Sequence, residues 1–82
     1  MELKDTINGM ISDDYKERFK AEYNQVVIRA KKLGYIITKA ENNEIEFNLA
    51  SKLEQLKKQL NIMCAYIAIL EDRAKTEGIN LD

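Results

Sequence analysis

Hydrophobic residues in two stretches of the chain recur at alternating spacings of four and three, the pattern that places side chains along one stripe of a helix. We call the two stripes the first and the second seam. The first seam consists of Phe19, Tyr23, Val26, Ala30, Leu33 and Ile37, and the second of Leu53, Leu56, Leu60, Met63, Ile67, Leu70 and Ala74. Two seams of similar length predict an antiparallel helical hairpin whose arms, at 1.5 Å of rise per residue, are about 38 Å long.

A shorter apolar pattern precedes the first seam, at Leu3, Ile7, Met10 and Ile11. Its spacing predicts a short amphipathic helix over about residues 2–11 with one apolar face. Ser12 and Asp13 then offer oxygens that can cap backbone N–H groups, and the pair Asp13 and Asp14 suits the positive end of a helix. The first long helix is therefore expected over about residues 13–40.

The hydrophobic period is lost after this helix, where asparagines and acidic residues predominate. Asparagine favours turns, so residues 41–49 are expected to form a loop. Ile45 and Phe47 alternate with acidic residues, which leaves two interpretations open. They form a short extended segment that folds back over the end of the hairpin, or they belong to a frayed loop.

Both ends of the last helix carry recognisable signals. Ser51 and Glu54 have the spacing of a capping box, in which each side chain accepts a hydrogen bond from the other's backbone N–H group. Gly78 can adopt the left-handed conformation that ends a helix. These signals predict a second long helix over about residues 50–77.

Composition allows one domain over residues 1–82 and few ways to reinforce it. A chain of this size buries about 60% of its unfolded surface, so its core is small. One cysteine cannot form an internal disulfide, and the absence of histidine removes the usual Cys/His zinc site. The lack of proline favours long helices. Oligomerisation remains as a source of stability.

Residues 62–70 are apolar or amphipathic without interruption, which exceeds what one seam needs. The off-seam members are Ile62, Ala65, Tyr66 and Ile69. A second copy of the chain is the expected cover, so the fold class is all-α, an antiparallel helical hairpin with a short N-terminal helix that assembles into a homo-oligomer. The alternative is that the N-terminal helix covers these residues within one chain.

Charge is distributed unevenly although the net charge is only −1. Residues 15–40 carry a local charge of +5, and a helix places Arg18, Arg29 and Lys32 on one side, with Tyr15 near it. Two interpretations stay open. The bases are solvated and pair with acidic residues of a neighbouring helix, or they form an anion site in which bases bind phosphate and a tyrosine stacks on a nucleobase.

Several function classes find no support in the sequence. No nucleophile motif, phosphate-binding glycine loop or carboxylate pair indicates an enzyme, a cofactor or a metal. Cys64 lies within the apolar run, where a small core residue is expected. Net acidity argues against duplex nucleic acid. No stretch is long enough to span a membrane and the first residues lack a signal-peptide core, so a cytoplasmic protein is expected.

Two segments resemble small helical-hairpin proteins of tailed phages, crAss-like and related ones. The first is residues 14–23 followed by Arg29 and Lys32, and the second places Gln59, Met63, Tyr66, Leu70 and Arg73 at fixed spacing. More distantly, residues 13–79 resemble the hairpin domain of phage anti-CBASS and anti-Thoeris sponges. That resemblance implies a non-enzymatic oligomer that holds cyclic di- or trinucleotides between subunits, with Tyr15 and Lys32 in the binding roles and Arg18 beside them.

The leading functional hypothesis is therefore a phage anti-defence protein that sequesters cyclic nucleotide messengers of bacterial immunity in the cytoplasm of an infected host cell. Its expected ligand-binding residues are Tyr15, Arg18, Arg29 and Lys32, and its expected oligomer interface is Ile62, Ala65, Tyr66 and Ile69. The alternative is a structural or protein-interaction adaptor that binds a larger protein partner through its apolar face.

Overall fold

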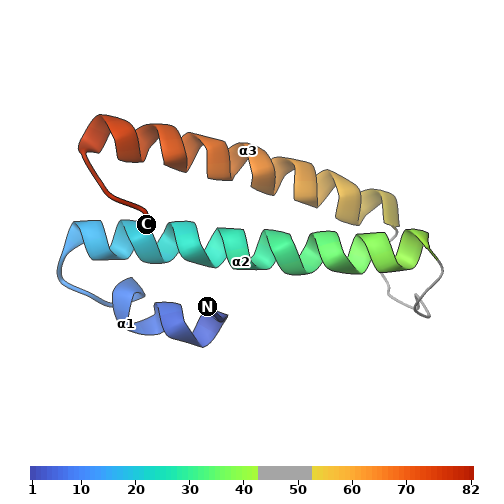
Figure 1. Cartoon of the computed structure of the whole chain (residues 1–82), viewed down its shortest axis with the longest axis horizontal. Helices are drawn as coiled ribbons and strands as arrows, with labels where there is room; N and C mark the ends of the chain where they lie inside the picture. Colours follow the sequence, from blue (N-terminus) through green and yellow to red (C-terminus); the bar gives the residue numbers. More distant parts are fainter. Residues whose placement is uncertain (43–52) are drawn as a thin grey trace.

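The computed structural model describes residues 1–42 and 53–82, and the described part is built from helices. The chain begins with a 3-10 turn, η1 (Leu3–Thr6), that continues into the short helix α1 (Ile7–Met10). Two long helices follow, α2 (Tyr15–Glu41) and α3 (Leu53–Glu77). They lie side by side and run in opposite directions (Figure 1). The predicted all-α fold is confirmed, with three helical elements packed together.

The two seams face each other between α2 and α3. Every seam residue is buried or half-buried, and Phe19, Leu70 and Ala74 are the most deeply buried side chains of the seams. Leu70 is fully covered, and together these three form a core cluster with Ile79. The alternating spacing of hydrophobic residues therefore identified the packing surface correctly.

Asp14 caps α2 at its beginning. Its side chain accepts a hydrogen bond from the backbone N–H of Lys16 at 2.9 Å, and α2 starts at Tyr15. Ser12 and Asp13 were the expected caps, but the Oγ of Ser12 instead accepts from the backbone N–H of Asp14 at 3.0 Å. Ser12 therefore shapes the turn that presents Asp14 to the helix.

The end of α3 follows the prediction for Gly78. This residue has φ of 69°, in the left-handed region, and the next backbone N–H, that of Ile79, donates to the carbonyl of Ala74 at 2.8 Å. That bond is the 6→1 contact of a Schellman motif. It turns the chain back so that Ile79 is buried in the core cluster. The proposed capping box at Ser51 and the segment of Ile45 and Phe47 lie outside the described residues.

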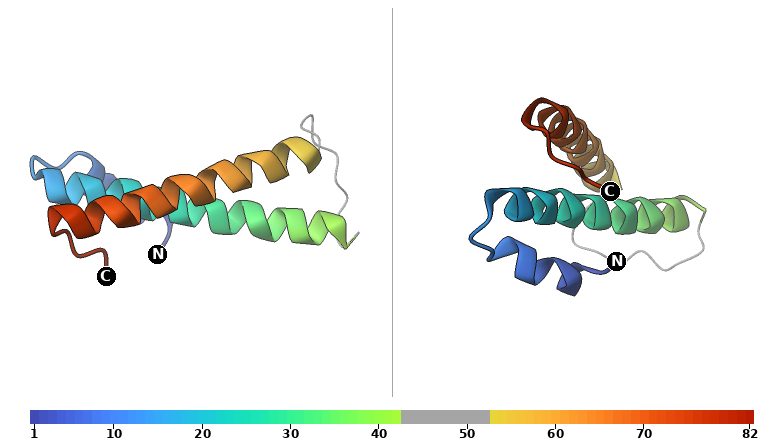
Figure 2. Two further views of the ribbon diagram at one scale, coloured as in Figure 1. Left: turned by 90° about the horizontal axis from the view of Figure 1, so that it is seen from above. Right: turned by 60° about the vertical axis from the view of Figure 1, so that its left-hand side comes forward.

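The N-terminal segment, residues 1–11, packs against α2 on the side opposite α3 (Figures 1 and 2). The alternative in which it covers the outer face of α3 within one chain is therefore wrong. Gly9 allows the close approach, since a Cβ there would stand 3.0 Å from the Cβ of Ala21. Thr6 is buried in the same contact, whereas Ile7 and Ile11 are exposed. Gly9 and Thr6 thus pack closely on α2, and of the predicted apolar residues Met10 contacts α2 through its sulfur, which accepts from Nε2 of Gln25.

The outer face of α3 consists of Ile62, Ala65, Tyr66 and Ile69, and no other part of residues 1–42 and 53–82 covers it. Ile62 is 70% exposed and Ile69 57% exposed. Tyr66 is less exposed because it lies against α2, where its hydroxyl donates to a carboxylate oxygen of Glu22. Cys64 is also exposed, so its predicted place in the core is wrong. The second seam runs through Met63 and Ile67, and Cys64 lies on a different side of α3.

Candidate functional site

Tyr15, an expected ligand-binding residue, belongs to a polar cluster where the start of α2 meets the end of α3. Its hydroxyl donates to Oε1 of Glu77 at 2.7 Å and accepts from Nη2 of Arg73 at 3.0 Å. The Nε of Arg73 also contacts Oε2 of Glu77 at 3.3 Å, and its guanidinium lies 5.0 Å from the ring centre of Phe19. We call these four residues the terminal cluster. The hydroxyl of Tyr15 is engaged within the chain, while the residue as a whole remains 45% exposed.

The terminal cluster shifts the acid–base properties of two of its members. The hydrogen bond to Glu77 raises the pKa of Tyr15, and desolvation and the negative charge of Glu77 act in the same direction against the opposing effect of Arg73. Desolvation lowers the pKa of Arg73, but its contacts with Glu77 and Tyr15 outweigh this and leave that pKa above its ordinary value. Tyr15 is thus neutral and Arg73 charged at neutral pH.

Arg18, a second expected ligand-binding residue, holds the turn between the N-terminal segment and α2. Its Nη1 donates to the backbone carbonyl of Ser12 at 2.8 Å. The guanidinium has further donors that this contact leaves available. Arg18 therefore combines a structural contact with spare hydrogen-bonding capacity at the surface.

Arg29 and Lys32, the other two expected residues, lie together in a groove between α2, α3 and the N-terminal segment. The groove has a volume of about 260 Å³. We call it the basic groove. Its lining consists of Leu3, Arg29, Lys32, Leu33, Ile36, Gln59 and Met63.

A second hollow of about 310 Å³ adjoins the basic groove and shares Lys32 with it. Lys31 and the apolar side chains of Val27 and Ile28 line it on α2, and Met1 lines it from the N-terminal segment. No carboxylate of the described residues lines either hollow. The two hollows therefore combine apolar walls with three cationic groups of α2.

The cations of these hollows make no ion pair within the part of the chain that the structure describes. Neither Arg29, Lys31 nor Lys32 has a hydrogen-bond or ion-pair partner there. By contrast, Lys57 contacts Glu41 at 2.7 Å. One interpretation of the sequence was that Arg29 and Lys32 pair with acidic residues of a neighbouring helix. Within the described residues of one chain they do not. Unpaired cations beside apolar walls suit a ligand with anionic groups and a flat apolar body.

The four expected ligand-binding residues do not converge within one chain. Tyr15 and Lys32 are 17 positions apart on α2, which corresponds to about 25 Å along a helix. Tyr15 and Arg18 lie near the start of α2, whereas Arg29 and Lys32 lie in the basic groove. A site that used all four would need two copies of the chain.

The sequence did not predict Leu3, Gln59 and Met63 as groove residues. The hydrophobic pattern predicts Met63 only as a residue of the second seam. Met63 also lines the groove because it lies at the edge of the contact between α2 and α3, where it is half-buried. Gln59 lies within α3 and lines the groove together with Arg29 of α2, a proximity that depends on the pairing of the two helices rather than on the pattern of either one. Leu3 lines the groove because the N-terminal segment packs on α2. The apolar pattern of this segment does not predict which helix it packs on.

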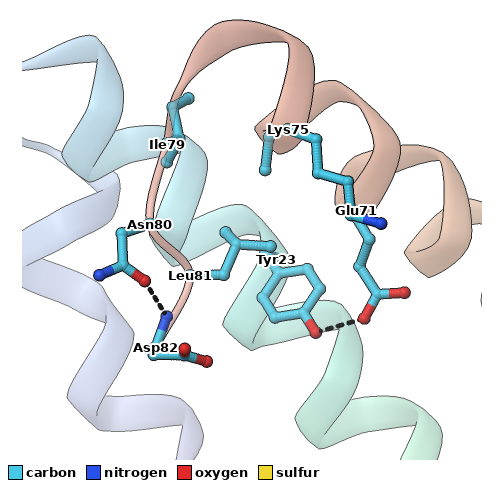
Figure 3. Close-up of a pocket in the computed structure, with 8 residues that line it drawn as sticks. Tyr23, Glu71, Lys75, Ile79, Asn80, Leu81 and Asp82 are labelled. Carbon is cyan, nitrogen blue, oxygen red and sulfur yellow. Dashed lines mark hydrogen bonds between the residues drawn. The ribbon is translucent and has the colours of Figure 1, made fainter.

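A third hollow, about 470 Å³ and larger than the other two, lies under the C-terminal residues that follow α3 (Figure 3). Its charges are mixed, with Lys75 beside Glu71 and Asp82. The hydroxyl of Tyr23 donates to Oε2 of Glu71 at 2.9 Å within it (Figure 3). Two carboxylates against one ammonium make this hollow a poorer anion site than the basic groove.

Two further findings concern the described residues. In residues 1–42 and 53–82, no group of three or more acidic or cysteine side chains could hold a metal ion. No helix within these ranges is long and apolar enough to cross a membrane.

Comparison with known proteins identifies a family. The model of a protein family described as Sequestin matches residues 13–76, which cover α2, all of α3 except Glu77, and the residues between the two helices. No curated protein and no solved structure matches the chain. The matched residues include all the lining of the basic groove except Leu3.

Proposed function

Since this chain belongs to the Sequestin family, we propose that it binds and sequesters a cyclic nucleotide messenger without converting it. The family name points to sequestration, which is a binding role. Such a role requires only affinity for the ligand, and no step of it needs a nucleophile, a general base or a metal. The proposed activity removes a messenger from solution by holding it.

The observation that carries this proposal is the set of unpaired cations in the basic groove. Arginine forms paired hydrogen bonds with phosphate oxygens, and lysine adds a mobile positive charge. Arg29 and Lys32 supply one of each, with Lys31 in the adjoining hollow. Leu33, Ile36 and Met63 offer the apolar surface against which a nucleobase or ribose packs.

The ligand class we propose is a cyclic di- or trinucleotide, and the setting is phage infection. By sequestering a messenger of the CBASS or Thoeris type, the protein would block bacterial immune signalling in the cytoplasm of the host cell. The resemblance to phage sponge hairpins supports this setting. A cyclic oligonucleotide carries several phosphates and bases, which is more than one shallow groove can enclose.

We therefore propose that the complete pocket lies between subunits of a homo-oligomer. In such a pocket, the exposed ring of Tyr15 from a second copy stacks on a base, and the spare donors of Arg18 reach a phosphate. The bare outer face of α3, with Ile62, Ala65, Tyr66 and Ile69, is the proposed contact between copies. Burial of this face would bring separate ends of α2 from two chains into one site.

Calorimetric titration tests the proposed binding activity. The wild-type protein is titrated with cyclic di- and trinucleotides and with cyclic ADP-ribose isomers, and the ligand is recovered for mass spectrometry. We expect saturable binding of at least one compound, its recovery unchanged, and a loss of about tenfold or more in affinity for Lys32→Ala, because a charged hydrogen bond is lost.

Lys16→Ala is the matched control. Lys16 lies on the same helix, is exposed, makes no ion pair with a described residue and lines neither hollow. Its loss should leave affinity unchanged. The proposal fails if no compound of the panel binds at micromolar protein, or if Lys16→Ala weakens binding as much as Lys32→Ala does.

A second candidate function rests on the exposed outer face of α3. An adaptor that binds a larger protein would also present an uncovered apolar face, and Ile62 and Ile69 are the most exposed members of this one. Light scattering distinguishes the two functions. A stable homo-oligomer favours the sequestering function, whereas a monomer that binds no cyclic nucleotide favours the adaptor.

A further inference from the structure

The basic groove contains a polar group that differs in kind from its cations, the carboxamide of Gln59. α3 contributes Gln59, whereas Arg29 and Lys32 come from α2. A guanidinium or an ammonium only donates hydrogen bonds, while a carboxamide both donates and accepts. Among the described side chains that line the groove, Gln59 is therefore the one strong acceptor for a ligand group.

The carboxamide of Gln59 is available for a ligand. Its residue is exposed, and its side chain makes no hydrogen bond with any part of the chain that the structure describes. Gln25 on α2 shows the contrast, since its Nε2 donates to the sulfur of Met10 at 3.3 Å. Binding through Gln59 would exchange water for a ligand without breaking a contact inside the protein.

The surroundings of Gln59 suit a planar ring beside it. Leu33, Ile36 and Met63 form the apolar part of the same groove. A nucleobase that packs there presents its polar edge to the lining side chains. A carboxamide pairs with the amino group and ring nitrogen of adenine, one bond donated and one accepted, whereas the two acceptors of guanine match arginine or lysine.

We propose that Gln59 is the specificity-determining residue of the groove, and that it selects adenine over guanine in a ligand whose phosphates contact Arg29 and Lys32. This inference rests on the proposed nucleotide-binding function and deepens it by naming the base. The division of labour follows from the side chains present. A cation that paired with guanine would no longer be available to neutralise a phosphate. Gln59 carries no charge, so its contact with a base leaves both cations free to bind phosphate.

Calorimetry with cyclic di-AMP and cyclic di-GMP tests the inference. We expect the wild-type protein to bind cyclic di-AMP more tightly. Gln59→Met keeps the length of the side chain but removes both hydrogen-bonding groups. It should weaken cyclic di-AMP binding by about tenfold, as expected for one lost two-bond contact with a base, and leave cyclic di-GMP affinity within about twofold.

Asn61→Ala is the control, because it removes an exposed amide of α3 that does not line the groove. It should change neither affinity. Circular dichroism confirms that each variant keeps its helix content.

The outcomes separate this inference from the function beneath it. Binding without preference for cyclic di-AMP, or an equal loss for both ligands in Gln59→Met, overturns the role of Gln59 and leaves sequestration intact. A preference for cyclic di-GMP that Arg29→Lys abolishes assigns base selection to Arg29 and also overturns it. Failure of the wild-type protein to bind any nucleotide overturns the proposed function and this inference together.

Discussion

Three tyrosine hydroxyls donate hydrogen bonds to glutamates of the facing helix across the contact between α2 and α3. The pairs are Tyr15 with Glu77, Tyr23 with Glu71, and Tyr66 with Glu22. Two tyrosines belong to α2 and one to α3, so the bonds run in both directions across the hairpin. Each tyrosine thus covers apolar surface with its ring and satisfies its hydroxyl at the rim.

The pKa of Tyr23 links one of these bonds to pH. The hydrogen bond to Glu71, burial, and the charges of Glu71 and Asp82 all raise this pKa above its ordinary value. A raised pKa in the folded state contributes stability below the ordinary tyrosine pKa of about 10, and the contribution is lost as pH rises through the folded pKa. We expect Tyr23→Phe to lower the free energy of unfolding by about 1 kcal/mol at pH 8.

The difference between wild type and Tyr23→Phe should shrink above about pH 10, because the wild-type hydroxyl then ionises beside Glu71. Thermal unfolding followed by circular dichroism at pH 8 and at pH 11 measures it. Tyr15, whose pKa is raised in the same direction, remains in both proteins. An unchanged difference at the two pH values would contradict the assignment to this hydrogen bond.

The contact between Tyr15 and Glu77 could not be predicted from the sequence. Tyr15 and Glu77 are 62 positions apart, and their contact depends on the axial register of two helices. The seam pattern predicts which faces meet but is nearly unchanged by a shift of one heptad. Engagement of the Tyr15 hydroxyl within the chain was therefore not predictable, although its position at the start of α2 was.

Two glycines of the helical elements have opposite surroundings. At Gly9 an added Cβ would stand 3.0 Å from the Cβ of Ala21 and 3.3 Å from the backbone oxygen of Glu17. Neither atom can move without moving α2. At Gly34 the nearest atom is a terminal methyl of Leu60 at 3.7 Å, which is ordinary contact. The same substitution at the two sites should therefore have opposite effects.

We expect Gly34→Ala to raise the free energy of unfolding by about 0.5 to 1 kcal/mol, since alanine restricts the unfolded chain and favours a helix. Gly9→Ala should lower it by about 1 to 2 kcal/mol, because overpacking forces the N-terminal segment away from α2. Urea unfolding at a single protein concentration measures the free energy of unfolding of each variant and of the wild-type protein. Stabilisation by both substitutions would show that α1 does not pack closely on α2.

The hydrophobic pattern determines the two long helices but not the position of the N-terminal segment. The long helices were predictable because thirteen seam positions agree with one geometry, and the cap shifted only from Ser12 and Asp13 to Asp14. The position of the N-terminal segment was not predictable from its hydrophobic pattern. Its apolar residues predicted a buried face, yet steric fit at Gly9 and Thr6 decides its side of α2.

Among the described residues, two uncovered apolar surfaces lie on opposite sides of α2. One is the outer face of α3, and the other, on the N-terminal segment, consists of Ile7, Met10 and Ile11. α2 separates them (Figures 1 and 2). A homo-oligomer can pair the α3 faces of two copies by two-fold symmetry, or join the N-terminal face of one copy to the α3 face of the next.

Mixing two variants distinguishes these assemblies. Ile69→Glu and Ile11→Glu each place a charge at an exposed position, so each chain should keep its helix content. If unlike faces meet, both variants lose self-association, and an equimolar mixture regains a one-to-one complex through the two intact faces. If α3 faces pair with each other, only Ile69→Glu dissociates, and mixing restores nothing. Light scattering measures the masses.

A mass that neither variant changes would exclude both surfaces as contacts between copies. The proposed pocket between subunits would then need a different interface, whereas binding by the groove of one chain would be unaffected. The measurement therefore tests the assembly separately from the chemistry of Arg29 and Lys32.

The position of α2 between two partners has a consequence for backbone dynamics. The N-terminal segment and α3 shield α2 from both sides, while α3 is shielded from one. Amide hydrogens exchange with solvent through local opening, which is easier where fewer contacts must break. Amides on the outer side of α3, near Ile62 and Ile69, should exchange faster than those in the middle of α2. If the exchange of these amides slows as protein concentration rises, the affected amides identify the residues that assembly covers.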